Sequence, residues 1–243
     1  MTDVLAPLLD LPDVSPALTQ AREAVDTALR HRALRRSGGP AAAEVSLRSA
    51  VASAALSSHV YAESDVRAGT VLDPVVQGSL RIAQELPTLA EKWTTAPRQV
   101  LARMHTIAAS GVLPAERLGR PVADPVVGGR LDALAELIVA EAGDPIVRAA
   151  VVHGELLALR AFEAADGIVA RAAARATLIS SGFDIRGLIP VDLGHLEREP
   201  EYVGSAYAFA TGTPDGVRSW LKHYGAALVV GAQRFTEIAD TLI

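Results

Sequence analysis

The sequence predicts a single all-α domain, and three observations support this fold class. Ala, the residue with the highest helix propensity, occurs 45 times in 243 residues, whereas Phe, Trp and Tyr together occur ten times. Apolar side chains recur every three or four positions along most segments, which is the spacing of one helix face. Several of these segments begin with Asp-Pro or Ser-Pro, which is typical of helix N-termini.

The composition also excludes several classes of function. The chain has no cysteine, which excludes disulfides, thiolate zinc sites, iron–sulfur clusters and a cysteine nucleophile. Its formal net charge of −5 argues against a charge-driven nucleic-acid binder. No secretory signal or membrane-length apolar run of about 20 residues is recognised. A soluble cytoplasmic protein that binds neither nucleic acid nor membrane is expected, and its Arg-rich, Lys-poor composition is typical of GC-rich bacteria.

Two helices are predicted before residue 60. Ser15 followed by Pro16 predicts the start of the first, because a hydroxyl caps free N–H groups and proline needs no partner there. The Gly-Gly-Pro of residues 38–40 predicts its end. A second helix is predicted over residues 42–57, and a polar break follows at residues 64–69.

The dipeptide Asp-Pro occurs three times, beginning at Asp73, Asp124 and Asp144. An Asp carboxylate can accept the free N–H groups of a helix start, so the first and third dipeptides predict helix N-termini. The second lies in a Gly/Pro-rich stretch, residues 111–129, for which an irregular segment or a short β-hairpin is predicted. A helix over residues 131–141 is predicted after it.

The remaining helices are expected from apolar periodicity. They are predicted at residues 97–109, 145–160, 168–180, 201–209 and 215–243. Together the elements predict an N-terminal helical extension, residues 1–41, and one helical domain, residues 42–243.

The segment from His153 to Arg171 predicts a helix, a short loop and a second helix. Gly167 allows close backbone approach at the end of the loop. The free N–H groups and the dipole at the start of the second helix favour an anion there. Arg171 would add a guanidinium fork for phosphate. The pattern indicates a phosphate-binding loop, although such turns also occur as purely structural connections.

The same segment resembles the core motif of the Fic (filamentation-induced-by-cAMP) family, which reads HPFxxGNGRxxR. Residues 160–171 here read RAFEAADGIVAR, so Phe162, Gly167 and Arg171 keep the residue of the motif. His153 stands seven positions earlier, where family members often carry another His.

Two more segments resemble parts of that family. Residues 111–129 lie where the family has a flap that docks its target. Residues 57–62 resemble its inhibitory helix, which makes Ser58 and Tyr61 candidate regulatory residues. Tyr61 stands at the position of the inhibitory Glu, so the family's pairing of that acid with Arg171 is not expected.

The resemblance implies a Fic-type helical bundle that transfers AMP from ATP to a target hydroxyl with Mg²⁺. Arg160, however, replaces the His that acts as general base, and a guanidinium cannot accept a proton near neutral pH. Ile168 replaces one phosphate-binding Arg, Asp166 replaces the Asn, and Ala164 replaces the metal ligand. AMP transfer is expected to be negligible, because a general base alone is worth about 10²–10⁴ in rate.

Two residues keep alternative roles at this stage. His153 is either a core residue or a substitute base. Asp166 is either a helix cap or, with Glu163, a Mg²⁺ ligand. The other histidines show no metal-ligand spacing.

The expected function is a catalytically degenerate Fic-fold protein, a binding or regulatory module with a remnant phosphate pocket at Arg160, Asp166, Gly167 and Arg171. The alternative is a divergent Fic enzyme that transfers AMP or another phosphate-containing group to a protein hydroxyl. A third hypothesis is a structural or dimerisation module with an empty pocket. No cofactor is expected to bind tightly, and ATP and Mg²⁺ are expected to bind weakly at most. The expected partner is an unidentified protein, which includes a second copy of the chain.

Overall fold

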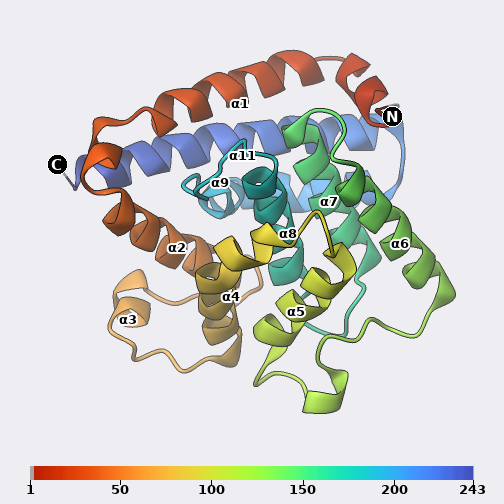
Figure 1. Cartoon of the computed structure of the whole chain (residues 1–243), viewed down its shortest axis with the longest axis horizontal. Helices are drawn as coiled ribbons and strands as arrows, with labels where there is room; N and C mark the ends of the chain where they lie inside the picture. Colours follow the sequence, from red (N-terminus) through yellow and green to blue (C-terminus); the bar gives the residue numbers. More distant parts are fainter. Residues whose placement is uncertain (1–2, 243) are drawn as a thin grey trace.

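The computed structural model describes residues 3–242 and confirms the all-α prediction (Figure 1). Within that range, a single isolated bridge between Ser110 and Leu113 is the only β-type pairing. No helix in the described range is long and apolar enough to cross a membrane. The helices are η1 (Ala6–Asp10), α1 (Val14–Leu29), η2 (Arg32–Arg35), α2 (Gly38–Ala55), α3 (Glu63–Arg67), α4 (Pro74–Glu91), α5 (Pro97–Ala109), η3 (Ala115–Arg117), α6 (Pro125–Ala140), α7 (Pro145–Leu159), α8 (Asp166–Ser180), α9 (Val191–Glu197), α10 (Glu199–Ala210) and α11 (Pro214–Asp240).

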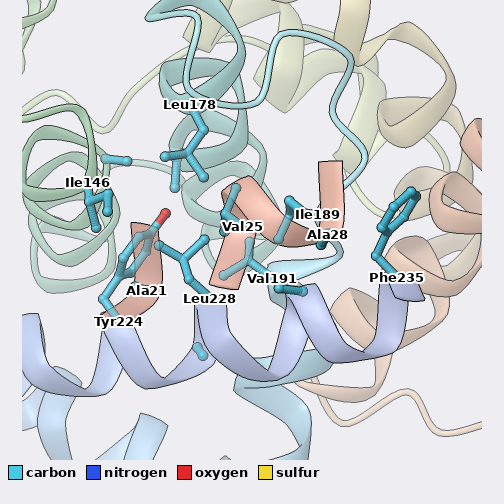
Figure 2. Packing of buried hydrophobic residues seen from close by; sticks show 14 of the residues in the cluster. Ala21, Val25, Ala28, Ile146, Leu178, Ile189, Val191, Tyr224, Leu228 and Phe235 are labelled. Atoms are coloured by element: carbon cyan, nitrogen blue, oxygen red, sulfur yellow. The ribbon is translucent and has the colours of Figure 1, made fainter. Parts of the chain in front are cut away.

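Helix α8 lies between two hydrophobic clusters and contributes to both. In the first cluster, α1 packs along the long helix α11, together with α7 and α9 (Figure 1). Figure 2 shows side chains of this cluster, among them Val25 of α1, Leu178 of α8 and Leu228 of α11. The second cluster is formed by α4, α5, α6 and α7 around the other side of α8. Residues 168–178 of α8 are all buried, so the start of this helix is firmly held.

All three Asp-Pro dipeptides open helices. The carboxylates of Asp73 and Asp144 each accept two N–H groups of the following helix, as predicted. Asp124 accepts the N–H of Val126 at 2.7 Å and opens α6, so the prediction of an irregular segment or hairpin up to residue 129 was wrong there. The tendency of Asp-Pro to start a helix thus outweighs the low helix propensity of the two glycines in the first turns of α6.

The stretch between α5 and α6 contains no strand within the described residues. Two hydrogen bonds hold it in place: Gly119 N donates to Nδ1 of His105, and Val122 N donates to the carbonyl of Ala161, both at 2.9 Å. The ring of His105 stacks on that of Phe162, with 4.2 Å between their centroids. The stretch is therefore attached to the loop that precedes α8.

Three local predictions differ from the structure. Residues 38–40 begin α2 instead of ending the preceding helix, because N–H groups in a first turn need no helical partner and proline is tolerated there. Helix α3 forms inside the predicted polar break, and α9 forms where only a loop was expected before residue 201. Elements of five to seven residues carry too little periodicity to be recognised from sequence.

Candidate functional site

The loop between α7 and α8 has left-handed backbone at both ends. Arg160, directly after α7, has a φ of 46°, and Ala165, directly before α8, has a φ of 60°. For residues with a Cβ this conformation costs roughly 1–2 kcal/mol each. The packing of α7 and α8 against each other keeps the loop in this form.

Asp166 fills this loop with its own carboxylate. Its Oδ1 accepts the N–H of Phe162 at 2.9 Å. Burial raises the pKa of Asp166 to about 6, against the opposing effects of that N–H and of the Arg160 charge. The carboxylate therefore occupies part of the loop and satisfies the Phe162 N–H from within the chain.

Arg171 is buried, and each nitrogen of its guanidinium donates to another part of the protein. Nε donates to Oγ of Ser53 at 2.8 Å, and Nη2 donates to the Ser53 carbonyl at 2.7 Å and to Oγ of Ser57 at 2.8 Å. Nη1 donates to the hydroxyl of Tyr202 at 3.2 Å. The buried carboxylate of Asp192 lies 3.8 Å from Nε of Arg171 and 3.6 Å from Nη1 of Arg175, so it offsets the charge of each arginine only in part. Arg171 therefore ties α8 to α2 and α10.

A cleft of about 630 Å³, called here the motif cleft, opens beside this loop between α7, α8 and α10. It brings together all four residues that the sequence predicted to bind phosphate, Arg160, Asp166, Gly167 and Arg171. A Cβ on Gly167 would lie 3.2 Å from Nη1 of Arg171, so the missing side chain lets the guanidinium lie close to the loop. The α10 wall includes the exposed side chain of Tyr207.

No protein-family model matches the sequence, and neither does any curated protein. Solved structures do match the whole arrangement. A segment of Fic-1 from C. elegans superposes with a TM-score of 0.75 at 18% identity, covering 97% of this chain and 75% of that one. A substituted form of the same segment gives a TM-score of 0.75 at 20% identity, covering 96% of this chain and 74% of that one. A Fic family protein from Desulfovibrio desulfuricans gives a TM-score of 0.73 at 17% identity, with 92% and 74% of the two chains covered.

The chain has the Fic fold. The residues that resemble the family motif, 160–171, lie at the end of α7, in the loop and in the first turns of α8. At the position of the motif His, Arg160 projects from the end of α7 with an exposed side chain. At the position of the first motif Arg, Ile168 is 1% exposed and belongs to the core cluster around α4 and α5. At these two positions of the resemblance the structure thus has an exposed cation and a buried apolar side chain.

His153 is fully buried behind the motif cleft. Its Nε2 lies 3.0 Å from the hydroxyl of Tyr202, which also accepts from Arg171. Burial, with the nearby Arg171 charge, holds the pKa of His153 well below its usual range. A neutral, enclosed imidazole bonded to Tyr202 has the environment of a structural residue.

Ser58 and Tyr61 do not meet Arg171. Ser58 is exposed in a left-handed turn after α2, with a φ of 68°. The hydroxyl of Tyr61 donates to Asp73 at 3.0 Å, on the N-terminal side of α4. Arg171 is instead reached by the C-terminal end of α2, through Ser53, and by the turn after it, through Ser57. Two hydroxyl residues four positions apart were the available sequence signal, and it is a weak one.

The residues at the Mg²⁺ position of the resemblance do not fit the ion. Ala164 offers no side-chain oxygen, and Glu163 pairs with Arg117 of η3. The Oδ1 of Asp166 already accepts the Phe162 N–H. Within residues 3–242 no group of three or more metal-ligating side chains comes together.

Proposed function

We propose that this chain is a catalytically degenerate Fic-fold protein, a binding or regulatory module whose motif cleft holds phosphate groups only weakly. The observation that carries the proposal is the state of Arg171. Its donors are used by Ser53, Ser57 and Tyr202, so the one motif arginine that remains serves the architecture. A phosphate would have to compete with these buried hydrogen bonds.

The absence of a base supports the same proposal. The guanidinium of Arg160 cannot accept a proton near neutral pH. His153 is the alternative base in the sequence, but it is enclosed and bonded to Tyr202. Loss of a positioned base costs about 10²–10⁴ in rate.

The charges in the motif cleft support weak phosphate binding. Arg160 and Arg171 contribute two positive charges, and the Asp166 carboxylate removes one when it is ionised above its pKa of about 6. One net positive charge, with the Phe162 N–H already engaged, is little for a triphosphate. We expect nucleotide dissociation constants no tighter than about 10⁻⁴–10⁻³ M, which corresponds to about 4–6 kcal/mol.

The test combines labelling and calorimetry on the full chain. With a labelled ATP analogue, neither the protein nor a lysate to which it is added should become labelled. Titrations with ATP, ADP and AMP, with and without Mg²⁺, should show weak binding or none. Arg160→His alone should not restore transfer, because Ile168 and Ala164 remain. Robust labelling that is lost in Asp166→Ala would overturn the proposal.

The volume of the motif cleft favours a second candidate, a divergent Fic enzyme that transfers AMP or another phosphate-containing group to a protein hydroxyl. A cleft of about 630 Å³ lies within the range of ligand sites, about 300–1,000 Å³. Submicromolar nucleotide binding that disappears in Arg171→Ala, while the variant stays folded, would favour this enzyme. For the degenerate module the proposed partner is a protein, which includes a second copy, and sedimentation velocity distinguishes the dimer from the monomer.

A further inference from the structure

A group of cations lies at the corner of the fold where η2 contacts both α2 and α11. Residues 30–36 read RHRALRR, four arginines without an acid, in a chain whose formal net charge is −5. The structure places Arg32, Arg35 and Arg36 around a cavity of about 500 Å³, called here the corner cavity. The rest of its lining shares no residue with the motif cleft and, among residues 3–242, carries no carboxylate; it consists of Ala33, Ser37 and Leu242.

The three arginines of the corner cavity have no counter-charge in the described part of the chain. Twelve of the 21 arginines form ion pairs with carboxylates of residues 3–242, but Arg32, Arg35 and Arg36 form none. The carboxylate of Asp240, at the end of α11, lies 3.2 Å from Nε2 of His31 and outside the lining. The corner therefore collects positive charge that these residues leave unbalanced.

The local backbone brings the cations together. In a 3₁₀-helix the side chains at positions i and i+3 eclipse each other, so Arg32 and Arg35 of η2 lie on the same face. Like charges at such a spacing repel each other. The N-terminus of α2 adds to the positive potential, because no side chain caps it and its first turn carries no acid. The Oγ of Ser37 instead donates to the carbonyl of Leu242 at 3.1 Å.

We propose that the corner cavity is a binding site for a short phosphate chain, that is, two or more linked phosphoryl groups. A single phosphate monoester carries a charge of about −1.5 to −2 at pH 7, which balances at most two of the three guanidinium groups. A second linked phosphoryl group supplies the remaining charge and further acceptor oxygens for the guanidinium forks. The volume of about 500 Å³ lies within the range of ligand sites, about 300–1,000 Å³.

The test titrates inorganic triphosphate into the full ¹⁵N-labelled chain. Amide signals of residues 32–37 and of Leu242 should shift, whereas those of residues 160–167 at the motif cleft should not. Binding should weaken as the salt concentration rises, because exposed cations are screened. A parallel titration with ATP distinguishes the sources of the phosphate chain. Equal affinity shows that the inorganic chain suffices, and tighter binding of ATP at the same signals identifies a nucleotide.

Matched variants separate a local contact from a change in net charge. Arg35→Gln should weaken triphosphate binding about tenfold, because a charge-assisted hydrogen bond is lost. Arg36→Gln should act in the same direction, and it provides a second exposed position if Arg35→Gln fails to fold. Arg120→Gln removes an exposed arginine outside the corner cavity and should leave the affinity unaltered.

Several outcomes would overturn the proposal. They are the absence of triphosphate binding, shifts confined to residues 160–167, or equal affinity in the wild type and both corner-cavity variants. Citrate carries three carboxylates on one small molecule, so citrate binding as tight as that of triphosphate would overturn the assignment to phosphate. The motif cleft is followed through its own signals, so a failure of either proposed site is seen independently of the other.

Discussion

The motif cleft and a second cavity of about 620 Å³, walled by α1, α10 and α11, lie on opposite sides of α10, and their arginines are used in opposite ways. Arg171 is the residue that a motif comparison would choose for phosphate binding, yet every nitrogen of its guanidinium already donates to protein atoms. Arg198 and Arg218, which line the second cavity and belong to no recognised motif, make only exposed ion pairs, with Glu201 and Asp215. The availability of a cation for a ligand thus depends on what surrounds it, more than on its place in a motif.

The largest expected effect is that of removing Arg171. Arg171→Met should lower the free energy of unfolding by about 3–5 kcal/mol, because Asp192 and the Tyr202 hydroxyl lose a buried partner. Arg218→Met, the matched change in the second cavity, should cost about 1 kcal/mol or less because the ion pairs of Arg218 are exposed. Urea denaturation followed by circular dichroism measures both. If the two variants proved equally stable, Arg171 would not be an architectural residue.

The second expected effect concerns the hydroxyl that connects Arg171 to His153. Tyr202→Phe should lower the free energy of unfolding by about 1–3 kcal/mol, because it leaves buried polar groups of both neighbours without a partner. Tyr207→Phe serves as the control, since this side chain is exposed at the rim of the motif cleft and should change stability by less than about 0.5 kcal/mol. Thermal unfolding of both variants tests the difference. If Tyr202→Phe left the stability unchanged, the buried hydrogen bonds of Tyr202 would contribute little to the free energy of unfolding.

The third effect is a dependence of stability on pH. The folded-state pKa of Asp166, about 6, lies above the ordinary value of 3.8, so the native state binds this proton more tightly than the unfolded chain. Its stabilising contribution is complete below about pH 4 and is lost as the pH rises to 6. Allowing for solvent screening at a partly exposed group, we expect about 1 kcal/mol over this interval.

Comparison of the wild type with Asp166→Asn isolates that contribution. Burial also raises the pKa of Asp184 to about 6, so both proteins share the slope that this second carboxyl produces. Asp166→Asn should show a flatter decline in stability between pH 4 and 6, measured by urea denaturation at each pH. Identical slopes would show that the carboxylate does not fill the loop in solution.

The smallest expected effect is at the candidate regulatory residue. Tyr61→Phe removes an exposed hydrogen bond to Asp73 and should change stability by less than about 0.5 kcal/mol. Nucleotide titrations of the variant should match those of the wild type, because Tyr61 does not reach Arg171. A change in nucleotide affinity would instead support a regulatory contact between this segment and the motif cleft.

Local chemistry made much of the fold predictable from sequence. Asp73 and Asp144 were predicted to start helices, and each accepts the free N–H groups at the start of one. The long periodic segment of α5 was predicted with both of its ends correct. The short helices α3 and α9 were not predicted, because five to seven residues carry too little periodicity. Helix α9 is in addition held by packing with the distant helices α2 and α11. The irregular stretch was predicted to run five residues too far, to residue 129, because Gly and Pro content was weighed above the cap at Asp124.

The site was predictable only in part. The sequence placed Arg160, Asp166, Gly167 and Arg171 in one neighbourhood, and the structure brings them around one cleft. The hydrogen bonds of Arg171 could not be predicted, because Ser53 lies 118 positions away along the chain. Burial and pairing of this kind arise from tertiary packing, which decides whether a motif residue is free to act.

The interior position of Ile168 has an evolutionary consequence. An arginine introduced there would place a guanidinium in an apolar core, and an unpaired buried charge costs several kcal/mol. Mutational routes from this sequence to a complete motif would therefore pass through poorly folded intermediates. Core packing around Ile168 therefore opposes the introduction of a cation at this position, because selection for stability would act against it.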